Sequence, residues 1–277
     1  MERKGFIGGS DLYNILRGDW HDLWLVKTGR KQPDDLSHIF KVNLGNVTEQ
    51  FNLDWLSKDT GLAMPRASED VEEKKLIIKA RSHVGIIEIP IKAKVDAIAE
   101  DEEGVQYVVE CKHTSSNRNM NDMLESYMPQ VQMYMHCHAI DKAYLSVIFG
   151  NTHDYCVVDR SKEYFNAVID RVADFWQFVV DDTEPPMDAA RYKIDWSSID
   201  INGLKLRDAS KDNHFTSLAS DFVLTQNKAK EHEAIKKELR SLVADDEREV
   251  FCDLLTIKRD KRGACRITVK EGDANHG

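Results

Sequence analysis

The sequence predicts an α/β core with a mixed central sheet flanked by helices, followed by a C-terminal extension of helices and a β-hairpin. Three observations lead to this prediction. Apolar residues near the start follow helical spacing, Ile- and Val-rich runs lie between about residues 76 and 112, and helix and strand patterns alternate from there to about residue 180. This order of elements is typical of a sheet covered by helices.

The composition is that of a globular protein. Its 277 residues are 42% hydrophobic and 31% charged, which is enough to build a sizeable core. No apolar run approaches the roughly 18 residues that cross a bilayer, and the start lacks a secretory signal, so we expect a cytoplasmic protein with no membrane partner. The five widely spaced cysteines indicate neither a disulfide framework nor a CxxC metal site.

The formal net charge of -10 argues at first against a nucleic-acid-binding protein, because Lys and Arg normally make the phosphate contacts. Basic residues nevertheless outnumber acidic ones in residues 1–31 and 226–270, so the acidity is concentrated between these segments. An ordinary solvated surface explains this distribution, and so does a carboxylate-lined metal site with basic flanks. Composition does not choose between them.

Three helices are expected before the strands. The first has Ser10 or Asp11 as its cap candidate, and the second runs from Asp19 to about Thr28 and ends at Gly29. The third covers residues 37–58. Its apolar residues define one helical face: Phe40, Leu44, Val47, Phe51 and Trp55.

Extended segments and two further helices complete the predicted core, which we place at residues 1–186. The extended segments are 76–81, 85–99, 105–112, 143–149 and 154–158, and the helices are 123–139 and 161–180. The C-terminal extension, 187–277, is expected to begin with an irregular segment to about residue 211. Helices over 213–243 and a hairpin over 249–269 with a basic tip at 258–263 follow.

Three charged residues in the predicted strands carry the functional argument. In a strand alternate side chains share a face, so Glu110 and Lys112 point the same way, about 7 Å apart, while His113 turns away. A hairpin centred on Glu103 sets Asp96 opposite Glu110, because both lie equally far from the centre. Two carboxylates held about 5 Å apart repel each other, and a bound divalent cation reverses this penalty.

Mg²⁺ and Mn²⁺ prefer oxygen ligands, so two carboxylates and a backbone carbonyl suit either ion. Lys112 could orient or deprotonate a metal-bound water, or neutralise charge on a phosphoryl group. The competing interpretation is a surface hairpin whose charged side chains are only solvated.

Two helical residues bear on this choice. Glu49 shares a face with Gly45, Leu53 and Leu56, away from the apolar stripe of its helix. We expect this second face to be covered as well, and a buried carboxylate requires a partner. Gln130 lies in a stripe with Tyr127, Val131 and Tyr134, so its amide is a candidate for a polar site. A surface glutamate and a core amide are the ordinary alternatives.

The ordered segments GNVTE, KVDAI, VVECKH and YMPQVQMY resemble the PD-(D/E)XK nucleases, specifically the YqaJ and lambda-exonuclease group. The opening IGGSDLYNIL followed by LWLVKTG is also similar to the YqaJ group. The resemblance covers about residues 3–160 and implies a restriction-endonuclease-like core.

The resemblance implies that Asp96, Glu110 and the carbonyl of Cys111 hold Mg²⁺, for which Mn²⁺ could substitute. It also implies that Lys112 activates the attacking water and that Glu49 and Gln130 complete the catalytic site. Arg3 and Ser10 match positions that hold the DNA 5′-phosphate in lambda exonuclease.

The implied activity is 5′ to 3′ digestion of linear double-stranded DNA, which supplies single strands to an annealing protein in phage recombination. A ring-shaped homotrimer is the implied assembly. A structure-specific or restriction-like endonuclease of the same fold is one alternative, and a non-catalytic DNA-binding or assembly module is another. In the extension, the basic tip could grip the DNA backbone or be only solvated, and the helices over 213–243 could contact another subunit.

Overall fold

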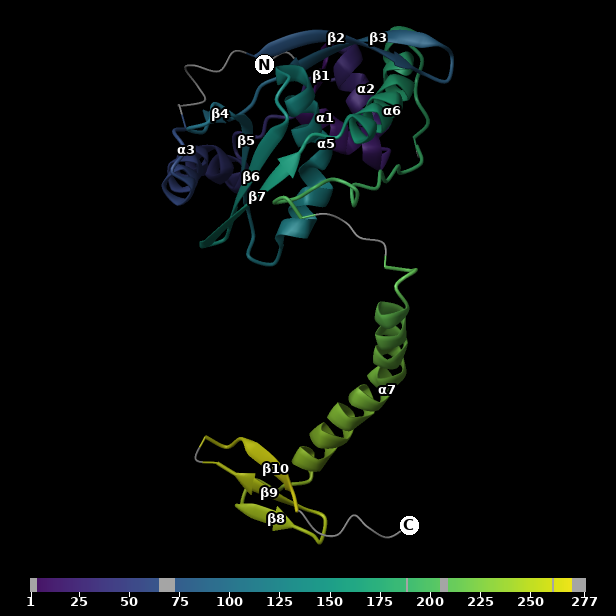
Figure 1. The fold of residues 1–277 in the computed structure, drawn as a ribbon. Coiled ribbons are helices and arrows are strands. Elements are labelled where there is room, and N and C mark those ends of the chain that lie inside the picture. The colour runs from purple at the N-terminus through teal and green to yellow at the C-terminus, as the bar shows by residue number, and fades with distance from the viewer. Residues whose placement is uncertain (1–3, 65–72, 188, 205–208, 261, 271–277) are drawn as a thin grey trace. The chain divides into compact units, whose positions relative to one another are not determined.

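The computed structural model of the chain describes residues 4–64, 73–187, 189–204, 209–260 and 262–270. The chain forms two compact units, Met1–Leu206 and Arg207–Gly277 (Figure 1). The predicted end of the nuclease domain at residue 186 stays a prediction, because a division into compact units does not test where an enzymatic domain ends.

The N-terminal part of the first unit is a short strand and two helices, β1 (Ile7–Gly8), α1 (Gly9–Arg17) and α2 (Trp20–Thr28). The predicted bounds of α2 are confirmed, with Asp19 as its N-cap and Gly29 in a left-handed conformation at its end. The expectation that Ser10 or Asp11 caps α1 is wrong. The N-cap is Gly8, whose backbone N–H donates to the Asp11 carboxylate at 2.8 Å.

Helix α3 (Phe40–Thr60) confirms the predicted helix, and the sheet packs on its second face rather than on the apolar stripe. Phe40 and Val47, in the apolar stripe, are each 78% exposed. Leu53 and Leu56, on the other face, are buried against the small side chains Ala97, Ala99, Val109 and Cys111. Periodicity identified the helix, but with two apolar faces available, the neighbouring sheet decides which one packs.

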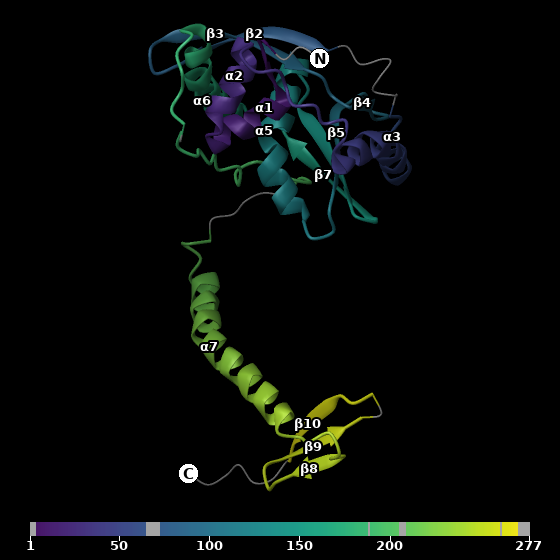
Figure 2. The same cartoon turned by 180° about the vertical axis from the view of Figure 1, so that it is seen from behind.

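The central sheet has four strands in the order β4 (Ala97–Glu100), β5 (Gln106–Thr114), β6 (Lys142–Phe149) and β7 (Thr152–Asp159). The β5 and β6 strands are parallel, and the two outer pairs are antiparallel. Helix α3 lies against one face, and α5 (Met120–His138) lies against the other, as Figures 1 and 2 both show. The prediction of a mixed sheet flanked by helices is therefore confirmed.

A second sheet joins β1 to β3 (Ile86–Ala93) and β3 to β2 (Lys74–Arg81). The extended segment predicted over 85–99 is therefore two strands in different sheets, because the chain leaves this sheet after Ala93 and enters the central sheet at Ala97. The spacing of apolar residues in this segment does not reveal that change of sheet. Helix α6 (Lys162–Val180) contacts α1, α2 and this second sheet.

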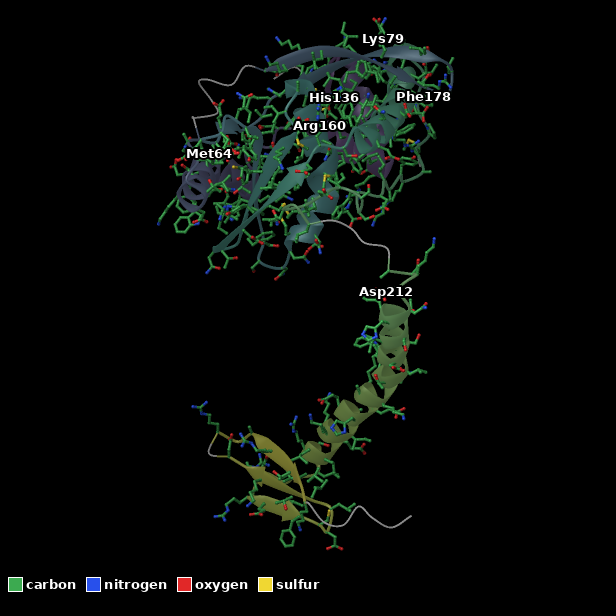
Figure 3. The ribbon with its side chains drawn as sticks, in the orientation of Figure 1. Met64, Lys79, His136, Arg160, Phe178 and Asp212 are labelled. Carbon is green, nitrogen blue, oxygen red and sulfur yellow. The ribbon has the colours of Figure 1, made fainter. Side chains whose placement is uncertain are left out.

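The second unit contains α7 (Asn213–Ser241) and an antiparallel sheet of β8 (Glu249–Phe251), β9 (Leu255–Arg259) and β10 (Cys265–Val269). The predicted hairpin is present as β9 and β10, and β8 adds a third strand. No described residue of α7 is buried, and Figure 3 shows side chains projecting along its length. In the described part of the chain, no helix combines the length and apolarity that spanning a membrane requires.

Candidate active site

The β4–β5 hairpin brings the two predicted strand carboxylates together. Its register pairs Ala97 with Val109, and one further step sets Asp96 opposite Glu110. The Asp96 carboxylate accepts a hydrogen bond from the backbone N–H of Cys111 at 2.7 Å. The register predicted from a turn centred on Glu103 is therefore confirmed.

Glu110 is the centre of a buried polar cluster on the α5 side of the sheet. The ammonium of Lys112 and the amide of Gln130 both donate to Oε1 of Glu110, the amide at 2.6 Å. Gln130 also donates to the Tyr134 hydroxyl at 3.0 Å, and the Lys112 ammonium lies 4.7 Å from the centre of the Tyr127 ring. The predicted helical stripe thus faces the predicted strand residues.

One oxygen of this cluster lacks a donor. Glu110 is 2% exposed, and its Oε2 is buried without any hydrogen-bond partner among the described residues. A buried carboxylate oxygen in this state costs free energy unless a cation or a donor reaches it. Together with the half-buried Asp96 opposite, this unpartnered oxygen fits a divalent cation with oxygen ligands.

The described residues contain no group of three or more His, Cys, Asp and Glu side chains arranged to hold a metal. A cation here would therefore depend on two carboxylates, the carbonyl of Cys111 and water. Mg²⁺ is commonly bound with such a small protein share, because it keeps several waters.

The electrostatics of the cluster follow from its burial. Burial raises the pKa of Glu110 to about 8, and the Asp96 carboxylate adds to the rise. Burial also raises the pKa of Asp96. For Lys112, burial acts to lower the pKa, but Glu110 and Asp96 outweigh this effect, so the pKa of Lys112 lies above its ordinary value.

The raised pKa of Glu110 makes a prediction for the metal-free protein. The folded chain holds a proton on Glu110 that the unfolded chain releases near its ordinary pKa of 4.5. This contribution to stability is fully present below about pH 4.5 and is lost as the pH rises to about 8. Urea unfolding in EDTA at several pH values measures it.

The matched control is Glu110→Gln, which keeps the shape and cannot titrate. Its unfolding free energy should fall less than that of wild type over the same pH interval. Parallel curves for the two proteins would contradict the shift.

Helix α3 reaches the site from the opposite face of the sheet. Glu49 is half-buried, and burial raises its pKa with a further contribution from Asp96. Asn52, one helical turn later, is buried and donates to the backbone carbonyls of Lys112 and Ser146, at 3.1 Å each. Asn52 therefore connects α3 to β5 and β6 by hydrogen bonds, next to Glu110 and Lys112 on β5.

The N-terminus of α1 lies against the same cluster. A Cβ atom at Gly9 would lie 2.6 Å from the Tyr134 hydroxyl and 2.8 Å from Cγ of Gln130, so only glycine allows this approach without a shift. Ser10 follows directly and is exposed in the first turn of α1. Arg3 lies outside the described residues.

The structure brings together Asp96, Glu110, Lys112 and Gln130, and Glu49 lies within electrostatic range of them. Sequence reasoning missed the supporting roles of Asn52 and Gly9. Asn52 carried a usable signal, since it lies three residues after Glu49 on the same helical face. His113 is directed to the α3 side, where its ring contacts the Thr48 hydroxyl at 3.0 Å, as alternation predicted.

A mixed sheet between helices, with an aspartate opposite an ExK strand and a glutamine on the covering helix, defines the PD-(D/E)XK class of proteins. The sequence agrees, because the model of the YqaJ-like viral recombinase domain matches residues 1–141. The chain belongs to this family.

Several solved structures are similar at low identity. The alkaline exonuclease LHK-Exo from Laribacter hongkongensis is 13% identical, with 64% of this chain and 89% of that chain covered and a TM-score of 0.45. The structure of LHK-Exo in complex with dAMP is 12% identical over the same shares of both chains, with a TM-score of 0.47. A phage related exonuclease from Haemophilus somnus 129PT is 10% identical, with 63% of this chain and 93% of that chain covered and a TM-score of 0.43. No curated protein matches the sequence.

Proposed function

We propose that the chain is a divalent-metal-dependent exonuclease that digests linear double-stranded DNA from its ends, 5′ to 3′. The observation that carries this proposal is the unpartnered oxygen of Glu110 in a buried cluster with Asp96 and Lys112. Buried polar groups are normally hydrogen-bonded, so this unpartnered carboxylate oxygen calls for an explanation, and a bound metal ion would supply one.

Asp96, Glu110 and the carbonyl of Cys111 would hold Mg²⁺ or Mn²⁺. The ion, when bound, would lower the pKa of a water and offset charge on a phosphoryl oxygen. The Lys112 ammonium, held by Glu110, would orient the attacking water or stabilise negative charge as it develops on the phosphorus oxygens. Gln130 holds Glu110 in place from α5, and Glu49 adds a carboxylate at the edge of the site.

The 5′ preference rests on the start of α1. The exposed Ser10 hydroxyl at the start of a helix suits a terminal phosphate, and Arg3 would add a fork of donors. We further propose that the digested ends serve an annealing protein in phage recombination within the host cytoplasm, and that the assembly is a homotrimer. Light scattering of the purified protein tests the last point.

The deciding experiment compares linear and covalently closed circular duplex DNA, each with purified protein and Mg²⁺. We expect linear DNA with either a 5′ or a 3′ label to be consumed, with the 5′ label released first, and circular DNA to remain intact. EDTA should stop digestion.

The other outcomes are informative as well. Cutting of closed circles would favour an endonuclease of the same fold. A folded, metal-supplied protein that digests neither substrate would favour a non-catalytic DNA-binding module. Digestion in EDTA would contradict the proposed metal.

A further inference from the structure

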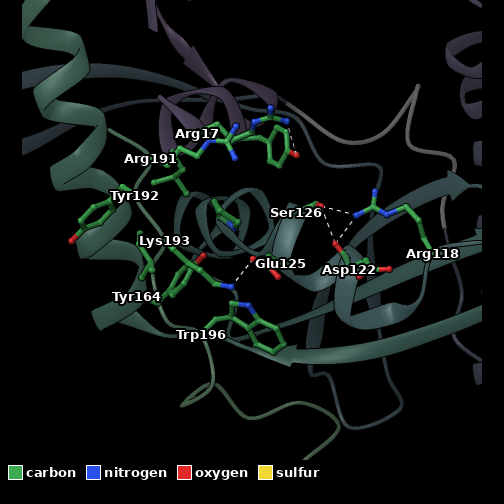
Figure 4. Close-up of a pocket in the computed structure, with 14 residues that line it drawn as sticks. Arg17, Arg118, Asp122, Glu125, Ser126, Tyr164, Arg191, Tyr192, Lys193 and Trp196 are labelled. Carbon is green, nitrogen blue, oxygen red and sulfur yellow. Dashed lines mark hydrogen bonds and ion pairs between the residues drawn. The ribbon is translucent and has the colours of Figure 1, made fainter. Parts of the chain in front are cut away.

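A concavity lined by charged and aromatic residues lies in the first unit, outside the Glu110 cluster. It is a cavity of about 580 Å³, within the size range of small-ligand sites. Its walls are α1, the first half of α5 and the segment 191–196 (Figure 4). We call it the α1–α5 cavity.

Basic residues dominate the charge of the α1–α5 cavity. Its lining includes Arg17, Arg118, Arg191 and Lys193 against two acids, Asp122 and Glu125. This excess of cations occurs in a protein with a formal net charge of -10.

Both acids of the cavity are already engaged. Glu125 pairs with Lys193 at 2.7 Å, and Asp122 accepts from the backbone of Asn119 in the cap of α5. Arg118 donates to the Asp122 carbonyl and the Ser126 hydroxyl (Figure 4). Among the described residues, no carboxylate pairs with Arg118 or Arg191, so their charges remain available to an anion.

Aromatic rings share the cavity with these cations. Tyr13, Tyr164, Tyr192 and Trp196 line it, and Tyr13 and Tyr192 are 41% and 48% exposed. The Arg17 guanidinium lies 5.2 Å from the centre of the Tyr13 ring and donates to its hydroxyl. Guanidinium groups bind phosphates and exposed rings stack on bases, which together favour single-stranded nucleic acid.

The α1–α5 cavity adjoins the candidate active site through the two helices that line both. On α5, Ser126 in the cavity lies four residues, about 6 Å along the helix, before Gln130. On α1, Tyr13 lies one turn after Gly9, which packs against Gln130 and Tyr134. A strand that passes the Glu110 cluster would therefore reach the cavity within a few nucleotides.

We propose that the α1–α5 cavity binds a single strand of DNA, with Arg118 and Arg191 on its phosphates and the exposed tyrosines on its bases. The assignment rests on the proposed function, because it identifies the ligand as a strand of the same DNA. It would hold that strand next to the reaction centre during digestion.

The test is equilibrium binding of a fluorescein-labelled dT12 oligonucleotide in EDTA, where no digestion occurs. Arg191→Glu should weaken binding at least about fivefold and reduce the slope of log K against log salt by roughly 0.7, the loss of one phosphate contact. Tyr13→Ala should weaken binding about five- to a hundredfold through lost stacking.

Two matched variants serve as controls. Arg81→Glu makes the same charge change at an exposed arginine at the end of β2, outside the cavity lining. Tyr13→Phe keeps the ring and removes the hydroxyl. Both should bind like wild type. Wild-type affinity and salt slope in Arg191→Glu would overturn the proposal. Displacement of dT12 by thymidine monophosphate at equal nucleotide concentration would also overturn it, because this result indicates a mononucleotide site.

The two proposals fail in different ways. If wild type digests linear duplex but Arg191→Glu binds dT12 fully, only the cavity assignment is wrong. If wild type digests no DNA but Arg191→Glu loses dT12 binding, only the proposed reaction is wrong.

Discussion

Replacing Lys112 by alanine is expected to slow digestion of linear duplex DNA by a factor of about 10²–10⁴, the range for a positioned catalytic group. Lys112 supplies the ammonium of the cluster, which contacts Glu110 from the same face of β5. Its side chain is 21% exposed, so it can reach both the buried carboxylate and a bound phosphate. Single-turnover rates with saturating enzyme and Mg²⁺ measure the loss.

The folded state should survive this change. Without its ammonium partner, the Glu110 carboxyl of the metal-free protein keeps the proton that burial already favours, so no unpaired buried charge remains. The circular dichroism spectrum and the DNA binding of Lys112→Ala in EDTA should therefore resemble those of wild type. The control variant is Lys79→Ala on β2, which should digest DNA at the wild-type rate. Glu110→Ala and Asp96→Asn should also lose digestion. A wild-type rate in Lys112→Ala would refute the catalytic assignment.

Replacing Asp11 by alanine is expected to destabilise the protein by about 3–5 kcal/mol, the cost of breaking a buried ion pair from one side. The Lys27 ammonium lies 2.5 Å from the Asp11 carboxylate, and the two side chains are 0% and 1% exposed. Asp11 also accepts from the backbone of Gly8 at the start of α1. Chemical denaturation at neutral pH measures the difference.

The control for Asp11→Ala is Asp22→Ala, which removes a carboxylate from an ion pair with Lys31 on the surface. Solvent screens this pair, so the unfolding free energy should hardly change. Equal midpoints for the two variants would show that the Asp11 pair contributes nothing. Because α1 lies against Gln130 and Tyr134, Asp11→Ala should also lower the digestion rate before the whole chain unfolds.

The candidate site was predictable where short-range geometry controls it. The hairpin register follows from the turn, since a strand pair has a two-residue period and a slip by one would turn Asp96 to the wrong face. Because side chains alternate between the two faces of a strand, the sequence placed Glu110 and Lys112 on one face of β5 and His113 on the other. Helical spacing on α5 directed Gln130 to a polar site.

The predictions that depended on packing partners were less successful. The apolar stripe of α3 has the periodicity of a core face, yet the sheet packs only on the second face, where Leu53 and Leu56 lie. The predicted extended segment over 85–99 is rich in Ile, but its strands β3 and β4 belong to different sheets. Both errors concern which surface an element meets, and the local pattern does not contain that information.

The sequence by itself determined the helices and strands, the spacing of the carboxylates and the direction of the strand side chains, because these depend on backbone geometry over a few residues. Only the tertiary structure decided that Gly9 approaches Gln130, that Asn52 binds the carbonyl of Lys112, and that Arg17, Arg118 and Arg191 share one cavity. These contacts join residues far apart in the chain, and they form only when apolar burial brings their elements together.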